Sequence, residues 1–243
     1  MPIRAVLFDY GHTLVDFRRT EEALHDAYAQ IRGRVEAAGY IQMHELLDLI
    51  ERVVSGVDQI VEASYAERRL EELDLVSVMT ESLEAVGFSL PSDVVDHIIA
   101  IYHSAFANSL AVSEGTLRTL QRLREDGYGM GLVSNVTLLP HLMRADLEEL
   151  GLAAFLDAAT FSSEVGVRKP HPKIFQSVLK DLRVAGDDAV FVGDRLLDDV
   201  SGARELGMRT VLTHEFRQES DPDIEPDAVI GSLTELPELL SSW

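Results

Sequence analysis

The chain has 243 residues, 46% of them hydrophobic and 26% charged, which is enough for one sizeable globular core or for a core domain with a smaller insert. Its formal net charge of -21 disfavours a nucleic-acid-binding protein, because a phosphate backbone is bound by clustered Lys and Arg. The absence of cysteine excludes disulfides and thiolate metal sites, and no apolar run approaches the length that spans a bilayer.

The first predicted element is a strand over residues 3–8. Its nearly continuous apolar run ends at Asp9. Such a run is typical of a strand that is buried on both faces of a parallel sheet. The residues before it show no signal-peptide pattern, so we expect a cytoplasmic protein.

A long stretch with helical character follows the first strand. Between about residue 18 and Leu110, apolar residues recur at the spacing of amphipathic helices. Gly39, Gly56 and the segment 87–91 are the predicted breaks between these helices. The sequence therefore predicts an inserted, all-helical cap domain over residues 17–110.

After Glu114 the pattern alternates between short apolar runs and helical segments. The predicted strands are 129–133, 158–161, 189–192, 210–212 and 228–230, and the predicted helices are 116–125, 139–150, 172–182, 198–206 and 233–240. This alternation predicts a doubly wound, Rossmann-like α/β fold with a parallel sheet. We expect residues 1–16 and 111–243 to form this core domain and the polar segment 215–226 to be an exposed loop.

Polar residues follow four of the apolar runs. They are Asp9 with Gly11 and His12, Ser134 with Asn135, Lys169 at the start of a helix, and Asp194 with Asp198 and Asp199. Because ligands of an open parallel sheet bind beyond the carboxyl ends of its strands, we expect these residues to form one site. Each residue type alone is common in loops and helix caps, but type, chain order and strand-end position agree at all four places.

Four segments carry a resemblance to a known family. They are Val6-Leu7-Phe8-Asp9, Leu132-Val133-Ser134-Asn135, Lys169-Pro170-His171-Pro172, and Phe191-Val192-Gly193-Asp194 through Gly202-Ala203. On these segments the chain resembles hydrolases of the haloacid dehalogenase superfamily with an inserted helical (C1-type) cap, over essentially its whole length. The resemblance implies a phosphatase that hydrolyses a small phosphorylated metabolite through an aspartyl-phosphate intermediate on Asp9.

The chemistry of the residues agrees with that implication. An anionic phosphate ester repels an attacking carboxylate, and a Mg²⁺ ion shared by Asp9 and Asp194 would offset this repulsion. Lys169 would add positive charge and the Ser134 hydroxyl a hydrogen bond as charge develops on the phosphoryl group. The resemblance implies that the backbone carbonyl of Gly11 is a further metal ligand.

The remaining predicted site residues have supporting roles. We expect Asn135 and His12 to contact the phosphate, together with Ser134 and Lys169. Asp198 and Asp199 are expected to position metal-bound water or Lys169 without binding the metal themselves. A solvated helix start with favourable dipole contacts explains either residue alone equally well. The sequence does not specify an oligomeric state.

The sequence departs from the phosphatase pattern at Gly11. Most phosphatases of the superfamily have there a second aspartate, which protonates the leaving oxygen. His12 or Asp16 could replace this acid, but a histidine bonded to the backbone and an aspartate that shapes the loop are the simpler explanations. We therefore expect slow turnover, a preference for good leaving groups, or a different acid.

Two other reaction classes in the superfamily also lack the second aspartate. Haloacid dehalogenases work without metal and usually replace the Gly-Asp pair that is present here as Gly193-Asp194, which favours the phosphatase. Phosphonate hydrolases need a Schiff-base lysine in the cap, and residues 17–110 contain no lysine. A third possibility is a degenerate member that binds a phosphorylated ligand or a protein partner without turnover.

The cap sequence says little about the substrate. Its polar candidates for ligand contact are Arg18, Arg19, His25, His44 and His103. Each of them is more simply explained as a solvated or packed residue. A small phosphorylated metabolite is expected because an inserted cap should shield the site from polymers.

Overall fold

The structure is a computed structural model that describes residues 2–17, 20–40 and 46–243. Six strands form one sheet in the order β3-β2-β1-β4-β5-β6, and every neighbouring pair is parallel. The strands are β1 (Ala5–Phe8), β2 (Gly129–Ser134), β3 (Ala158–Phe161), β4 (Ala189–Gly193), β5 (Arg209–Thr213) and β6 (Ala228–Ile230). The predicted doubly wound α/β fold is confirmed.

The chain divides into two compact units. One comprises residues 1–16, 111–136 and 144–243 and contains the sheet, and we call it the core unit. The other comprises residues 17–110 and 137–143 and is helical, and we call it the helical unit. Among the described residues, no helix is both long and apolar enough to cross a membrane.

The centre of the sheet is where the strand order reverses. β1 lies between β2 and β4, and all four of its residues are buried. Phe8 pairs with Val192 on β4, and the Asp9 N–H continues this ladder by donating to the Val192 carbonyl at 2.9 Å. The residues that follow β1 and β4 therefore emerge side by side at the carboxyl edge, the usual position of ligands in such sheets.

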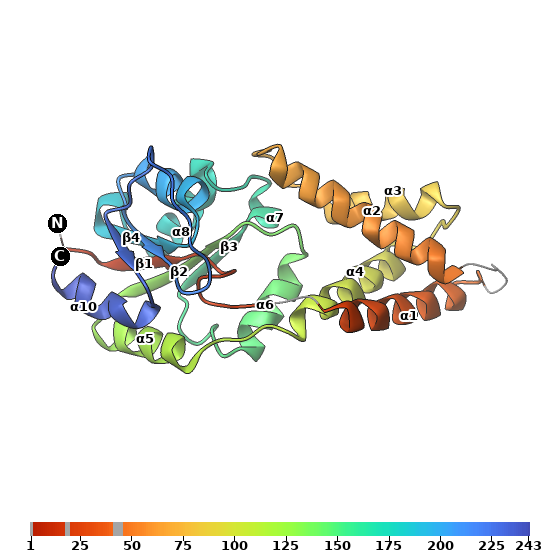
Figure 1. The fold of residues 1–243 in the computed structure, drawn as a ribbon, viewed down its shortest axis with the longest axis horizontal. Coiled ribbons are helices and arrows are strands. Elements are labelled where there is room, and N and C mark those ends of the chain that lie inside the picture. Colours follow the sequence, from red (N-terminus) through yellow and green to blue (C-terminus); the bar gives the residue numbers. More distant parts are fainter. Residues whose placement is uncertain (1, 18–19, 41–45) are drawn as a thin grey trace. The chain divides into compact units, whose positions relative to one another are not determined.

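Helices cover both faces of this sheet (Figure 1). They are α5 (Glu114–Glu125), α7 (Ser162–Val165), α8 (Pro172–Leu182), α9 (Gly202–Arg204) and α10 (Leu236–Ser241), with a π-helix at Leu196–Ser201 and 3₁₀ turns at Gly186–Asp188 and Leu233–Glu235. α8 packs against β2 and β3, and its Phe175 and Val178 share a buried cluster with Leu7 and Phe191. On the opposite face α5 and α10 lie together.

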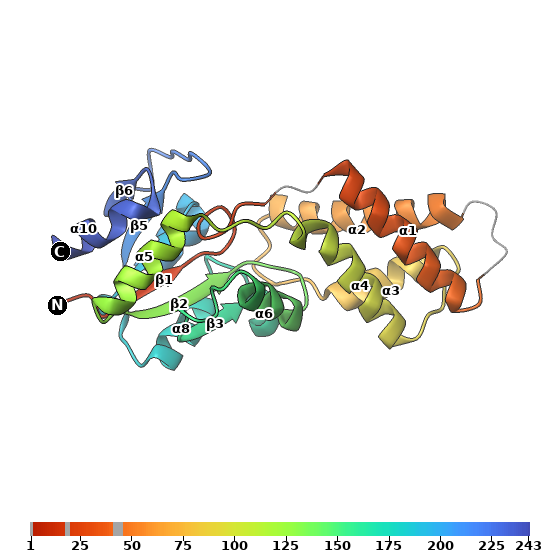
Figure 2. The same cartoon turned by 90° about the horizontal axis from the view of Figure 1, so that it is seen from below.

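The helical unit has its own hydrophobic core. Its helices are α1 (Glu21–Ala37), α2 (Leu46–Ala66), α3 (Leu75–Ala85) and α4 (Ser92–Ala107), which Figure 2 shows side by side. Each of them contributes buried residues to one hydrophobic cluster. Thr20 caps α1 and Asp74 caps α3 through side-chain oxygens that accept backbone N–H groups. Leu138, Leu139 and Leu142, at the start of α6 (Pro140–Glu149), pack against the same core.

Two predictions about local structure were wrong. Gly56 does not break a helix but lies inside α2, where the flanking apolar residues Val53, Val54 and Val57 are buried. The helix expected at 198–206 begins instead as the π-helix at Leu196.

The cap residues Arg18, Arg19 and His44 lie outside the described residues. Of the other cap candidates, His25 is exposed, whereas His103 is buried in α4.

Candidate active site

Three of the predicted residues meet at the carboxyl edge of the sheet. The Lys169 ammonium donates to Asp9 Oδ1 at 2.6 Å and to Asp199 Oδ1 at 2.7 Å. Side-chain exposure is 3% for Lys169, 11% for Asp9 and 1% for Asp199, so these ion pairs are shielded from water. Such shielding makes a pair strong only if the groups keep their partners, because an unpaired buried charge is costly.

Lys169 is held in place through its backbone. The Asn135 side chain accepts a hydrogen bond from the Lys169 N–H at 2.6 Å and donates to the Lys169 carbonyl at 3.1 Å. Asn135 follows β2 directly. This pair of hydrogen bonds therefore fixes the connection between β3 and α8 to the end of β2. The side chain that was expected to bind phosphate thus positions Lys169, and a phosphate contact by Asn135 would fall to its backbone N–H.

Asp199 reaches Lys169 because Gly193 has no side chain. A Cβ atom on Gly193 would lie 2.2 Å from Asp199 Oδ2, closer than any real contact. Asp199 Oδ2 also accepts the Arg195 N–H at 2.9 Å, so both of its oxygens are engaged. The Gly193-Asp194 pair therefore has two functions. Gly193 leaves space for the Asp199 carboxylate, and Asp194 provides a further carboxylate.

Asp9, Asp194 and Asp199 form one carboxylate cluster. Among the residues that the structure describes, they are the one group with three potential metal-binding side chains, and one oxygen from each lies within 4.8 Å of the others. Asp194 Oδ2 is buried and receives no hydrogen bond. Oxygen-only ligands of this kind suit Mg²⁺ better than softer metals.

The charges of this cluster are not balanced within the protein. Burial, which outweighs the opposing charge of Lys169, raises the pKa of Asp9 to about 6. Burial and then the charges of Asp9 and Asp199 raise the pKa of Asp194 to about 7. Burial acts to lower the pKa of Lys169, but the two carboxylates outweigh it and raise that pKa above its usual range. An additional cation would therefore offset the negative charge of these carboxylates.

The other predicted residues lie around this cluster. Ser134 is buried at the end of β2, the strand that pairs with β1, and its role in the reaction stays a prediction. Asp198 does not join the carboxylate cluster; its Oδ2 lies 3.5 Å from Arg195 Nη1, and burial and the charge of Asp199 raise its pKa. Of the two aspartates expected behind the site, only Asp199 contacts Lys169.

The loop after β1 is a tight turn. The Tyr10 carbonyl accepts the N–H groups of residues 13, 14 and 15, and the His12 N–H donates to the Val15 carbonyl at 2.7 Å. The resulting bridge uses the neighbours of Gly11, so it does not consume the Gly11 carbonyl that was expected to bind metal. The expected roles of Gly11 in metal binding and of His12 in the reaction stay predictions.

His12 is poorly suited to be a positively charged acid. Its φ of 58° is in the left-handed region, and its Nδ1 lies 3.5 Å from Asp16 Oδ1. Burial and the charge of Arg217 lower its pKa, despite the opposing effect of Asp16. The lowered pKa disfavours the protonated, positively charged form of the imidazole.

Arg217 was not predicted from the sequence. It lies in the loop between β5 and β6, which was expected only to be exposed, and its Nη1 is 3.0 Å from Asp194 Oδ2. The distance is that of an ion pair, although its angles do not make a hydrogen bond. No motif spacing connects residue 217 to the strand ends, so only its type, an arginine in a polar loop after a core strand, could have suggested it.

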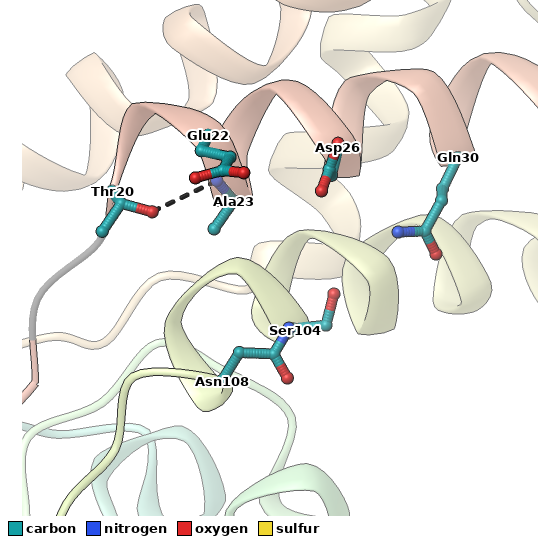
Figure 3. Close-up of a pocket in the computed structure, with 7 residues that line it drawn as sticks. All are labelled: Thr20, Glu22, Ala23, Asp26, Gln30, Ser104 and Asn108. Atoms are coloured by element: carbon teal, nitrogen blue, oxygen red, sulfur yellow. Dashed lines mark hydrogen bonds between the residues drawn. The ribbon is translucent and has the colours of Figure 1, made fainter.

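A groove of about 250 Å³ lies between α1 and α4 in the helical unit. It is lined by seven residues, which Figure 3 labels: Thr20, Glu22, Ala23, Asp26, Gln30, Ser104 and Asn108. It contains none of the predicted site residues. Its two carboxylates, Glu22 and Asp26, lie on the solvent side of α1, where charged residues are ordinary.

Comparison with known proteins adds independent information. The glyceraldehyde 3-phosphate phosphatase of Pyrococcus furiosus is 31% identical to this chain, over 98% of this chain and 92% of the relative. The ribulose-1,5-bisphosphate 5-phosphatase of Halopiger xanaduensis is 30% identical, over 92% and 87%. The crystal structure of a 2-haloacid dehalogenase from Pseudomonas syringae pv. Tomato DC3000 aligns with a TM-score of 0.69 at 26% identity and covers 99% of both chains.

The protein-family model described as haloacid dehalogenase-like hydrolase matches residues 3–207. This range includes all four segments that carry the resemblance, from Val6 to Ala203. The chain belongs to the haloacid dehalogenase-like hydrolase family.

Proposed function

We propose that this protein is a magnesium-dependent phosphatase that hydrolyses a small phosphorylated metabolite and uses Asp9 as its nucleophile. The observation that carries the proposal is the Lys169 ammonium between Asp9 and Asp199, beside the buried carboxylate of Asp194, whose Oδ2 receives no hydrogen bond. The phosphatase names of the relatives from Pyrococcus furiosus and Halopiger xanaduensis support the same class of reaction.

The residues present fit a bound Mg²⁺. Asp9 and Asp194 would hold it together with the Gly11 carbonyl, because both oxygens of Asp199 already have partners. When bound, the ion would neutralise the carboxylates and draw charge from the phosphoryl oxygens. The raised pKa values of Asp9 and Asp194 support this assignment, since burial disfavours their charged forms and a bound cation would favour them.

The protein groups would act in two steps. In the first, an Asp9 carboxylate oxygen forms a bond to phosphorus and the bond from phosphorus to the leaving oxygen breaks. Lys169 binds Asp9 Oδ1, which leaves Oδ2 for the attack, and Ser134 would donate its hydroxyl to a phosphoryl oxygen. In the second, water attacks phosphorus, the bond to Asp9 breaks, and inorganic phosphate leaves.

The domain organisation is part of this proposal. Residues 1–16 and 111–243 would be the catalytic core, and residues 17–110 the cap that selects a small substrate. A cytoplasmic location fits a metabolite as substrate.

A 2-haloacid dehalogenase is the second candidate function. The structural likeness to such an enzyme and the missing aspartate at Gly11 favour it. Dehalogenation needs a carboxylate nucleophile but no cation, and it would leave the buried Asp194 carboxylate without a use. The phosphatase therefore accounts for more of the site.

One assay separates these functions. Hydrolysis of p-nitrophenyl phosphate should require Mg²⁺ and stop with excess EDTA, whereas halide release from 2-chloropropionate should not be detectable. Halide release that persists in EDTA, without phosphate hydrolysis, would establish the dehalogenase instead. Binding of inorganic phosphate without turnover of either substrate would indicate a degenerate member of the family.

A further inference from the structure

The loop between β5 and β6 brings a guanidinium group to the carboxylate cluster. Arg217 Nη1 lies 3.0 Å from Asp194 Oδ2, and 34% of the Arg217 side chain is exposed while only 3% of the Asp194 side chain is. Arg217 is thus a partly exposed charged residue at the rim of the site, with one guanidinium nitrogen beside a buried carboxylate.

Contacts with the core unit anchor this loop on both sides of Arg217. Glu215 accepts the Leu233 N–H at 2.5 Å, and Glu219 accepts the Leu196 N–H at the start of the π-helix. Farther along, Ile224 packs against the cluster of Leu196, Val200 and Leu212. Arg217 therefore lies between two anchored glutamates, which hold this part of the loop near the site.

Arg217 lies at the carboxyl end of one of the two central strands. Its Nη1 atom is 3.0 Å from an oxygen of Asp194. Asp194 follows β4, which pairs with β1 at the centre of the sheet. The guanidinium is consequently above the strand ends where the proposed reaction takes place.

The ion pair between Arg217 and Asp194 is a loose one. Although Arg217 Nη1 lies 3.0 Å from Asp194 Oδ2, this contact lacks hydrogen-bond geometry. A divalent cation that binds Asp194 directly would compete with the guanidinium for the same oxygen. Arg217 would then be left at the rim with its planar set of donors, which matches the oxygens of a phosphoryl group.

We infer that Arg217 binds the phosphoryl oxygens of the substrate and that Asp194 holds this arginine when no metal ion is bound. The inference rests on the proposed phosphatase function and adds a substrate-binding residue to it. It also accounts for two features that the reaction leaves unexplained, the anchored loop and a partly exposed cation beside a buried carboxylate.

The test uses the whole protein with inorganic phosphate as probe. Phosphate binding is measured by calorimetry at saturating Mg²⁺ for the parent protein, Arg217→Gln and Arg217→Lys. Arg118→Gln is the matched control, because Arg118 is 71% exposed and pairs only with Glu114 in its own helix. Mg²⁺ affinity is measured separately, without phosphate, from the shift of the melting temperature.

Loss of the guanidinium should weaken phosphate binding by roughly tenfold to a hundredfold, the usual effect of losing hydrogen bonds to a charged group. Arg217→Lys should lose less, since it keeps the charge, and Arg118→Gln should match the parent. Mg²⁺ affinity should be unchanged or higher in Arg217→Gln, because a competing cation has been removed. Each comparison is made on protein that melts cooperatively.

Three results would overturn the inference. These are a phosphate affinity of Arg217→Gln within about twofold of the control, a loss of Mg²⁺ affinity in that variant, and an absence of phosphate binding by the parent protein. Failure of the proposed function has a different signature. In that case the parent binds phosphate through Arg217 but hydrolyses no phosphate ester.

Discussion

The Lys169 ammonium lies 2.6 Å from the Asp9 carboxylate, and both groups are nearly inaccessible to water. A buried ion pair of this kind contributes little compared with a packed apolar pair, but removal of one partner is costly because the other charge stays buried. Lys169 is the one positive charge with hydrogen bonds to both Asp9 and Asp199 in the described structure. The stability of the core unit should depend on it.

Replacement of Lys169 by Met should lower the free energy of unfolding by about 3–5 kcal/mol in EDTA at pH 8. The loss should be smaller at pH 5, where protonation of Asp9 removes part of the unpaired charge. Urea denaturation at both pH values measures it. Lys180→Met, at an exposed position of α8, is the control and should change stability by less than about 0.5 kcal/mol. Equal effects of the two substitutions would contradict the role of Lys169.

Gly193→Ala should disrupt the site without removing any charged group. The new Cβ would lie 2.2 Å from Asp199 Oδ2, so the carboxylate that holds Lys169 must move. We expect a loss of stability of about 1–3 kcal/mol, as for other overpacked positions, and a lower kcat. Gly56→Ala in α2 is the control, because no atom lies within 4 Å of its Cβ and alanine is the better helix former. It should stabilise by about 0.5–1 kcal/mol.

Much of this site could be predicted because the motifs lie at the ends of apolar strands. Strand β1 is buried on all sides, so its run of apolar residues is clear in the sequence, and Asp9 is fixed at its end. The meeting of Asp9 with Asp194 follows from parallel strands whose carboxyl ends share one edge. Lys169 lies beyond α7 and is held there by the hydrogen bonds between its backbone and Asn135.

Other features depend on contacts between distant residues and left no local signal. The helix after Asp194 begins at Leu196 rather than at 198, and Glu219, 23 residues later, accepts the Leu196 N–H. Arg217 reaches the site through the same loop. Gly56 is tolerated inside α2 because buried valines on the same helix secure it. Spacing along the chain contains none of this information.

The pH dependence of Mg²⁺ binding follows from the raised pKa values of Asp9 and Asp194. Both carboxyls have an ordinary pKa of 3.8, and in the folded, metal-free protein these values are about 6 and about 7. The folded protein therefore binds protons that the unfolded chain releases, so the metal-free protein should lose stability as the pH rises from about 4 through 7.

Mg²⁺ should reverse this loss, because it binds the ionised carboxylates. Its stabilising effect should be small at pH 5 and should reach about 2.7 kcal/mol at pH 8 when its concentration is a hundredfold above Kd. Thermal melts across this pH range measure it, and Asp194→Asn should remove most of the increase. An increase that is the same in Asp194→Asn would exclude Asp194 as a metal ligand.

The missing acid at Gly11 makes a separate prediction. If leaving-group protonation limits the rate, Gly11→Asp should accelerate esters of alkyl alcohols more than aryl esters, by up to a hundredfold or so. Uniform changes for all esters would mean that the new carboxylate only perturbs the site.

His12→Asn tests the neighbouring imidazole. Asparagine tolerates the left-handed φ of 58° but does not titrate. Because the pKa of His12 is lowered, we expect the variant to keep the parent's selectivity between alkyl and aryl esters. Selective slowing of alkyl esters with a flatter pH profile would instead identify His12 as the acid.

The most direct test of the account is to trap the phosphoryl group on Asp9. The parent protein is mixed with Mg²⁺ and excess p-nitrophenyl phosphate, quenched in acid during turnover and digested, and the peptide that contains Asp9 is weighed by mass spectrometry. A fraction of this peptide should carry one phosphoryl group, and Asp9→Asn should show none while its turnover falls about a thousandfold or more. Turnover by Asp9→Asn near the parental rate, or a phosphoryl group found on another residue, would contradict the claim that Asp9 is the nucleophile of a phosphatase.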